Sequence, residues 1–190
     1  MKKPVLTLFT LLLLVNSMTA QTQKTAGQIF SEIQKLNTVG TVLFVAAHPD
    51  DENTRMISYL SNEKHLDITY LSLTRGDGGQ NLIGSEIREL LGIIRTQELL
   101  AARRVDGGKQ LFSRANDFGY SKHPDETLNI WNKAEVLEDV IWTIRKLQPD
   151  VVINNPINLR PSSAVIFNAF AVSATPPANL ASPSCSLSSA

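Results

Sequence analysis

The residues best suited to chemistry lie in the stretch VLFVAAHPDDENT, residues 42–54, where an apolar run ends in a histidine and three acids. A histidine nitrogen and a carboxylate oxygen are both good zinc ligands, and three protein ligands with one open position make a catalytic zinc site. The spacing of His48 and Asp51 predicts a turn in which both side chains converge on one ion. Asp50 would then be free to take a proton from water as a general base. One histidine and one aspartate do not by themselves select zinc over another divalent ion.

The same residues have a second interpretation, the acidic start of a helix. Acidic side chains are common in first turns, where the helix dipole favours negative charge, and Asp51 and Glu52 would open such a helix. A buried strand that runs straight into His-Pro-Asp-Asp-Glu favours the metal site, but the residues alone leave both interpretations open.

A strand is predicted to carry these residues to the edge of a sheet. Residues 41–47 are an apolar run between Gly40 and Pro49, which is typical of a fully buried strand in a parallel sheet. Further strands are predicted at 67–74, 109–113 and 150–154, and helices at 26–37, 53–63, 85–105 and 133–148. This alternation indicates a parallel α/β sheet. Because ligands of such sheets bind outside the carboxyl ends of the strands, His48 lies where a site is expected.

Several other residues have structural interpretations. The stretch RGDGG, residues 75–79, predicts a turn beside the site, because it lacks the Gly-Lys-Ser/Thr of a phosphate loop. Ser85 is a candidate N-cap for the helix at 85–105, and Arg103 near its end suits the helix dipole. Trp131 and Trp142 are eleven residues apart, so they share one helical face if the helix starts early enough, and both are predicted to pack into the core.

Length and composition place limits on the protein class. The chain has 190 residues, which suggests one domain, and a formal net charge of +0, which gives no support to nucleic-acid binding. Residues 1–20 have a basic start, an apolar run over 4–15 and small residues up to Ala20, as in a secretory signal peptide. We therefore expect an exported protein, periplasmic or secreted; an N-terminal anchor or a buried helix is the alternative. Cys185 is the only cysteine, so an internal disulfide is excluded.

Three motifs carry a resemblance to a known family. The stretch AAHPDDE resembles the signature of the PIG-L (LmbE-like) family of zinc-dependent N-acetylglucosaminyl deacetylases. The stretches SLTRGDGGQN and IRTQELLAARRV are similar to the second loop and the Arg-x-x-Glu-Leu helix of that family. The similarity runs from about residue 39 to residue 154.

The resemblance implies a set of roles. His48 and Asp51 would be the first two zinc ligands, and Asp50 the general base. Arg95 would contact the substrate, and Asp117 would bind sugar hydroxyls. The implied fold is a Rossmann-like parallel α/β sheet with helices on both faces. The implied reaction releases acetate and a free amino sugar from an N-acetylated sugar or glycoconjugate.

The chain departs from the family pattern after residue 155. The family takes its third zinc ligand from a histidine-rich segment that follows the strand at 150–154, and no histidine follows here. The other two histidines, His65 and His123, lie in predicted surface segments and are not expected to be ligands. Residues 156–190 are rich in Ser, Ala and Pro and carry no charge from Pro161 onward, which predicts an aberrant or disordered tail. A shifted reading frame would produce such a break.

These observations predict a signal peptide (1–20), an incomplete deacetylase domain whose C-terminal part is missing (21–155) and the tail (156–190). We expect this polypeptide to bind zinc weakly, to have low stability and to be weakly active or inactive. Two functions follow: a zinc-dependent N-deacetylase, or a non-catalytic carbohydrate-binding or interaction module that has lost its metal centre. A Rossmann nucleotide binder is disfavoured, because no Gly-x-Gly-x-x-Gly follows the first strand.

Overall fold

The computed structural model describes residues 23–119 and 124–154. The predicted signal peptide, His123, Cys185 and the predicted tail lie outside the described residues. The chain divides into two units, Met1–Gln34 and Lys35–Ala190. Within the described residues, no helix has both the length and the apolar character that crossing a membrane requires.

The described part of the first unit, residues 23–34, contains the helix α2 (Ala26–Lys35) up to Gln34, where the sequence predicts a helix. Its start is fixed by a reciprocal capping box: the Thr25 hydroxyl accepts from the Gln28 amide at 3.3 Å, and the Gln28 side chain accepts from the Thr25 amide at 2.8 Å. None of its residues is buried.

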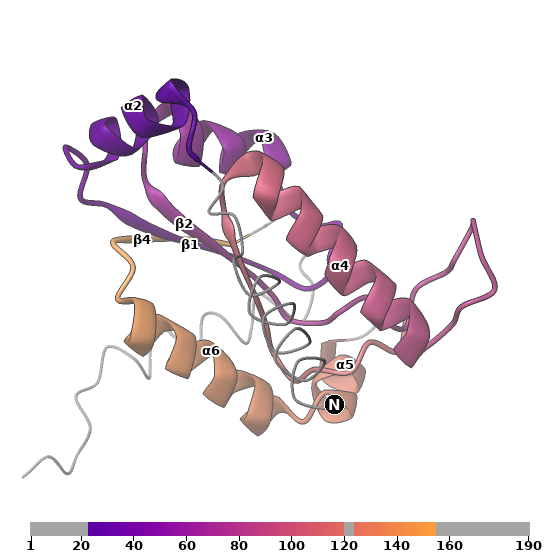
Figure 1. Ribbon diagram of the computed structural model, residues 1–190. Helices are drawn as coiled ribbons and strands as arrows, with labels where there is room; N and C mark the ends of the chain where they lie inside the picture. Colours follow the sequence, from indigo (N-terminus) through magenta and orange to yellow (C-terminus); the bar gives the residue numbers. More distant parts are fainter. Residues whose placement is uncertain (1–22, 120–123, 155–190) are drawn as a thin grey trace, which may run out of the picture. The chain divides into compact units, whose positions relative to one another are not determined.

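The second unit contains a parallel sheet of four described strands, β1 (Thr41–Ala46), β2 (Asp67–Ser72), β3 (Lys109–Phe112) and β4 (Val151–Asn154). Their order is β3-β2-β1-β4, with every neighbouring pair parallel (Figure 1). All four strands lie where the sequence predicts them. Because β1 has a partner on each side, the residues that follow it emerge at the middle of the carboxyl edge.

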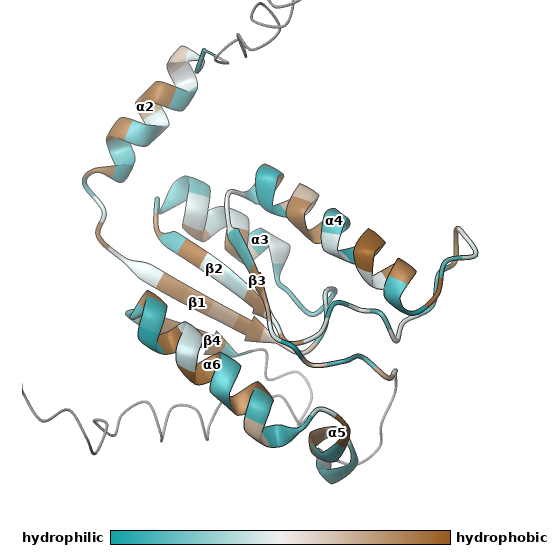
Figure 2. Ribbon diagram, turned by 60° about the horizontal axis from the view of Figure 1, so that its bottom comes forward, coloured by the Kyte–Doolittle hydropathy of each residue, from teal (hydrophilic) through white to brown (hydrophobic). Residues whose placement is uncertain are grey.

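Helices cover both faces of this sheet, as predicted. On one face Leu43, Val45 and Leu71 pack against Val136 and Val140 of α6 (Lys133–Leu147). The hydrophobic colouring of β1 continues along most of the strand (Figure 2), as expected for a strand buried on both sides.

The opposite face is covered by α3 (Thr54–Ser58) and α4 (Glu89–Asp106), which contribute Ile57 and Leu99. Phe44 and Tyr70 from the strands complete this layer, with their ring centroids 5.7 Å apart in an edge-to-face arrangement. Met56 packs against this cluster.

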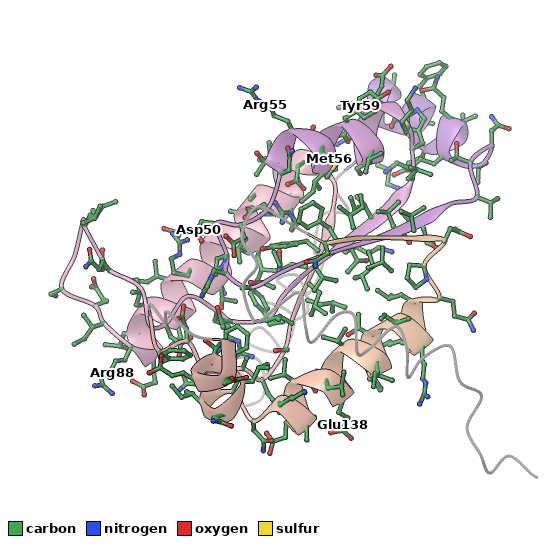
Figure 3. All side chains as sticks on the ribbon, turned by 180° about the vertical axis from the view of Figure 1, so that it is seen from behind. Asp50, Arg55, Met56, Tyr59, Arg88 and Glu138 are labelled. Carbon is green, nitrogen blue, oxygen red and sulfur yellow. The ribbon has the colours of Figure 1, made fainter. Side chains whose placement is uncertain are left out.

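The helix predicted over residues 53–63 divides into two segments. The Asn53 side chain accepts from the Met56 amide at 3.0 Å and starts α3, which continues into a π-helical turn, η1 (Tyr59–Glu63). Arg55 and Tyr59 point outward from this segment, whereas Met56 faces inward (Figure 3).

Ser85 is not the N-cap of α4, which begins at Glu89. The Asn81 side chain accepts from the amides of Ile83 and Gly84, at 3.0 and 2.9 Å. Such local bonds satisfy backbone donors outside a helix and stabilise a loop instead.

The prediction that both tryptophans lie in the core is wrong for Trp142, which is 54% exposed, whereas Trp131 is 4% exposed. Because α6 begins at Lys133, Trp131 precedes the helix and the two residues do not share a helical face. Trp131 follows a short helix that the sequence did not predict, α5 (Pro124–Ile130).

Candidate active site

The His48–Asp51 segment forms a tight turn at the carboxyl end of β1. The Asp51 amide donates to the His48 carbonyl oxygen at 3.2 Å, and Pro49 is buried inside the turn. The Tyr70 hydroxyl, from the neighbouring strand β2, donates to the same carbonyl oxygen at 2.6 Å. The turn is therefore closed by its own backbone and attached to the sheet by a tyrosine.

The interpretation of Asp51 and Glu52 as the start of a helix is wrong, because α3 begins at Thr54 and has no acidic residue in its first turn. Asp51 instead folds back on the histidine: its Oδ2 atom accepts from the His48 amide at 3.0 Å and lies 3.2 Å from the Nδ1 atom. The two side chains thus converge as their spacing predicts. That they hold an ion stays a prediction.

A second carboxylate approaches the imidazole from the other side. The Oδ1 atom of Asp117 lies 4.0 Å from His48 Nε2, and the Asp117 side chain is only 6% exposed. Burial by itself lowers the pKa of His48, but the hydrogen bond that the imidazole makes to the Asp51 carboxylate and the negative charges of Asp117, Asp51 and Asp50 outweigh it and raise that pKa. The electrostatics of the site thus favour a positive charge.

Asp117 reaches this position because two loops touch through glycines. The loop at residues 75–79 contains a turn, in which the Gly79 amide donates to the Gly76 carbonyl oxygen at 3.2 Å. A Cβ atom at Gly78 would lie 2.5 Å from the Gly119 nitrogen and 2.6 Å from the Asp117 oxygen. Because only glycine permits so close a backbone approach, this contact explains why a glycine occupies position 78.

All five predicted site residues line one cavity of about 430 Å³ at the carboxyl edge of the sheet: His48, Asp50, Asp51, Arg95 and Asp117. Gly76, Gly79 and Gly119 complete part of its wall. Arg95 comes from α4 and forms an exposed ion pair with Glu98 at 3.3 Å. The structure brings the five residues together, and their chemical roles stay predictions.

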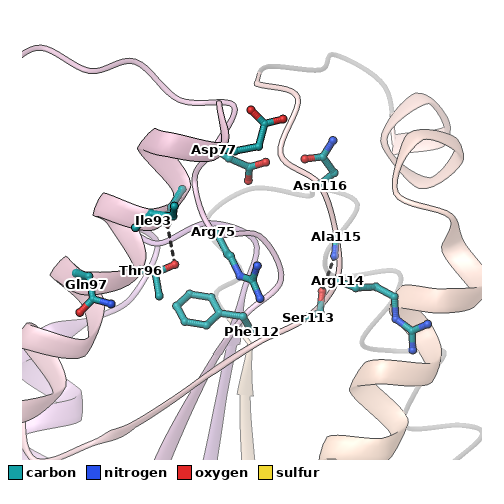
Figure 4. Close-up of a pocket in the computed structure, with 12 residues that line it drawn as sticks. Arg75, Asp77, Ile93, Thr96, Gln97, Phe112, Ser113, Arg114, Ala115 and Asn116 are labelled. Atoms are coloured by element: carbon teal, nitrogen blue, oxygen red, sulfur yellow. Dashed lines mark hydrogen bonds between the residues drawn. The ribbon is translucent and has the colours of Figure 1, made fainter. Parts of the chain in front are cut away.

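A second cavity, of about 530 Å³, lies between α4 and the segment that follows β3. Arg75 lines this cavity and does not line the one around His48. Its guanidinium lies over the Phe112 ring at 5.8 Å and faces the segment that carries Ser113 and Arg114 (Figure 4). The loop at 75–79 therefore contributes residues to two separate cavities.

The donors at the first cavity suit zinc in kind, since they combine a histidine nitrogen with carboxylate oxygens. They are fewer than a zinc site needs: among the described residues, no group of three or more His, Cys, Asp or Glu side chains is placed to hold an ion. The segment from which the family resemblance expects a third ligand lies outside the described residues.

The sequence interpretation missed the residues beneath the turn. Arg103 was explained by the helix dipole alone, but its side chain is 4% exposed and forms an ion pair with Asp106 at 2.6 Å. Its Nη2 atom also lies 3.5 Å from Glu52 Oε1. The Arg-Arg pair near the end of a long helix is a weak signal, because the sequence does not show which of the two faces the sheet.

The fold and the cavity define a parallel α/β domain with a histidine–aspartate site at the carboxyl edge of its central strand. The chain belongs to the PIG-L family: residues 43–158, more than half of the chain, match the family described as GlcNAc-PI de-N-acetylase. None of the curated proteins matches the chain significantly.

Solved structures share this fold at low sequence identity. The N,N'-diacetylchitobiose deacetylase from Pyrococcus horikoshii is 20% identical with a TM-score of 0.57, covering 83% of this chain and 62% of its own. The 4-carboxy-2-hydroxymuconate hydratase GalB from Pseudomonas putida KT2440 is 20% identical with a TM-score of 0.54, covering 70% of this chain and 57% of its own. A deacetylase of teicoplanin biosynthesis is 13% identical with a TM-score of 0.50, covering 70% of this chain and 62% of its own.

The chain thus spans about three fifths of the length of these structures. They include a hydratase as well as deacetylases, so the shared fold does not by itself decide the reaction.

Proposed function

We propose that the chain carries the site of a zinc-dependent deacetylase that removes the acetyl group from an N-acetylated sugar or glycoconjugate. One observation carries this proposal: His48, Asp50 and Asp51 line a single cavity at the carboxyl edge of the sheet in a member of the PIG-L family. The neighbouring deacetylase structures support it as fold relatives.

His48 and Asp51 are the residues that would hold the zinc. When bound, zinc polarises a carbonyl group and lowers the pKa of water toward neutrality. Asp50 is exposed and lines the same cavity, a position that suits the proposed general base. In the proposed reaction Asp50 takes a proton from the attacking water and delivers it to the departing amide nitrogen. The acetamide C–N bond breaks, a C–O bond forms, and acetate and an amine leave.

Two further residues are proposed to hold the sugar. The buried Asp117 carboxylate faces the cavity beside His48 and suits a hydrogen bond from a sugar hydroxyl group. Arg95 lies on the α4 side of the cavity, where its guanidinium would donate to a sugar or acetamide oxygen.

The test is deacetylation by the purified full chain with added zinc, using a panel of N-acetylglucosaminyl conjugates and measuring both acetate and primary amine. We expect equal amounts of the two products, loss of activity with a chelator, and a loss of about 10²–10⁴-fold in Asp50→Asn. Product release by Asp50→Asn at the unsubstituted rate would refute Asp50 as the base.

The alternative function is sugar binding without catalysis, and the shortage of metal donors among the described residues favours it. Saturable binding of an N-acetylated sugar that a chelator leaves unchanged, with no release of acetate, would support that module and overturn the deacetylase.

We also propose that the chain is exported through residues 1–20, on the strength of their basic and apolar pattern. Mass spectrometry of the protein from a producing cell tests this. A mature N-terminus next to Ala20 is expected, and an intact Met1 in exported material would contradict it.

A further inference from the structure

A buried arginine contacts Glu52, the residue that follows the turn of the candidate site. The Arg103 side chain is 4% exposed and is held by Asp106, whose two carboxylate oxygens accept from its Nε atom at 3.1 and 3.0 Å. A second nitrogen, Nη1, donates to Gln110 Oε1 at 3.2 Å. Held at several nitrogens, the planar guanidinium has a fixed orientation.

Besides its bonds to Asp106 and Gln110, the same guanidinium makes two further contacts. Its Nη2 atom lies 3.5 Å from Glu52 Oε1, and its central carbon lies 5.4 Å from the centre of the Tyr70 ring. The Glu52 side chain is 8% exposed, and within the described residues its Oε2 atom has no hydrogen-bond partner. Burying an incompletely satisfied carboxylate is unfavourable, and buried ion pairs are weak evidence for stability. Another explanation for Glu52 is therefore needed.

Glu52 and Tyr70 connect the His48–Asp51 turn to neighbouring elements, in addition to the bonds between His48 and Asp51 within the turn. Glu52 directly follows Asp51, so its contact with Arg103 lies at the exit of the turn. The Tyr70 hydroxyl fixes the entry, by donating to the His48 carbonyl oxygen at 2.6 Å. Arg103 contacts the Glu52 carboxylate and the Tyr70 ring, so it touches one residue at each end of the turn.

We propose that Arg103 and Tyr70 are positioning residues, which act through Glu52 and the His48 carbonyl to hold the imidazole and the Asp51 carboxylate in the orientation that binds an ion. This inference rests on the proposed function only in taking His48 and Asp51 as ligands. The competing explanation is that the network merely joins α4 to the sheet. That role would change the stability of the fold without changing the order of the turn.

The experiment compares three variants of the full, metal-free chain. Tyr70→Phe removes one hydroxyl and leaves the His48 oxygen its bond from the Asp51 amide, so this variant should fold. Arg103→Lys keeps the charge but loses the planar fork. Thr143→Val is the matched control, because it removes a buried hydroxyl that donates to the Asp139 carbonyl oxygen at 2.8 Å on α6.

The first readout is the NMR order parameter of the Asp51 amide, which reports the rigidity of the turn without any metal. We expect it to fall from about 0.85 to below about 0.6 in Tyr70→Phe and Arg103→Lys, and to stay unchanged in Thr143→Val. Unchanged order in Tyr70→Phe would overturn the proposal. An equal fall in Thr143→Val would also overturn it, because the loosening would then be general.

The second readout is zinc affinity, which we expect to fall at least tenfold in Tyr70→Phe and to stay unchanged in Thr143→Val. A loosened turn in a chain that binds no zinc even without substitution would support the positioning role and refute the proposed function. A rigid turn and unchanged affinity in Tyr70→Phe would refute the positioning role alone.

Discussion

Replacing Gly78 by alanine tests whether the contact between the two glycine loops places Asp117. The added methyl carbon would meet three backbone atoms, the Gly119 nitrogen at 2.5 Å and the carbon and oxygen of Asp117 at 2.6 Å. Backbone atoms cannot rotate away as a flexible side chain can. The two loops must therefore separate by about 1 Å to reach ordinary contact distances of ~3.5 Å.

The magnitude follows from this forced movement. Overpacking a well-packed contact typically costs about 1–3 kcal/mol, and we expect Gly78→Ala to lower the free energy of unfolding by that amount. The Asp117 carboxylate, now 4.0 Å from His48 Nε2, would move away from the imidazole. Because the charge of Asp117 helps to raise the pKa of His48, that pKa should fall toward its ordinary value of 6.5.

The assay is urea denaturation together with NMR titration of the His48 ring in the metal-free chain. Gly79→Ala is the control from the same loop, because its nearest contact is a milder 3.2 Å to the Gly76 oxygen. We expect it to cost less than about 1 kcal/mol. The reasoning would be refuted if Gly78→Ala matched the unsubstituted chain in both stability and the pKa of His48.

Three further predictions concern the fold that supports the site. Leu43→Ala, at a fully buried position of the central strand, should lower the free energy of unfolding by about 2–5 kcal/mol. Val39→Ala, at a position that is 99% exposed, should change that free energy by less than about 0.5 kcal/mol. Denaturation curves of the two variants test this difference. Burial raises the pKa of Tyr70 above its ordinary value of 10.0. The contribution of Tyr70 to stability is therefore complete below pH 10.0 and is lost as the pH rises above 10.0. Ultraviolet titration should show this phenol ionising only as the chain unfolds. Hydrogen bonds from the backbone amide and the hydroxyl of Thr41 lower the pKa of Asp150. The contribution of Asp150 to stability is therefore present above pH 3.8 and is lost as the pH falls through the lowered pKa. Asp150→Asn should reduce the acid sensitivity of the urea midpoint, and an unchanged pH dependence would contradict the assignment.

The centre of the sheet could be predicted because almost every residue of β1 and β2 is buried. The apolar run at residues 41–47 has no polar face, so it is readable as a central parallel strand, and it forms β1. The His48–Asp51 turn was predictable for a related reason, because a proline and acidic residues directly after such a run mark a point where the chain leaves the core.

The parts that could not be predicted depend on contacts between distant segments. Arg103 and Arg104 have the same chemistry and the same place near a helix end, yet Arg103 is buried and Arg104 is exposed. The rotation of α4 on the sheet decides between them, and neither residue reports it locally. The Trp142 prediction is a different case, because the predicted helix at 133–148 already excludes Trp131, and α6 does begin at Lys133.

The most direct test of the central claim is a zinc titration of the full chain by competition with a chromogenic chelator, with His48→Ala, Asp51→Ala and His65→Ala compared in parallel. His65 is the control, because it is a histidine that does not line the cavity around His48. The account predicts a single zinc, removable by dialysis against a chelator, that is lost in His48→Ala and Asp51→Ala and retained in His65→Ala. Absence of zinc binding, or binding that survives both His48→Ala and Asp51→Ala, would contradict the account.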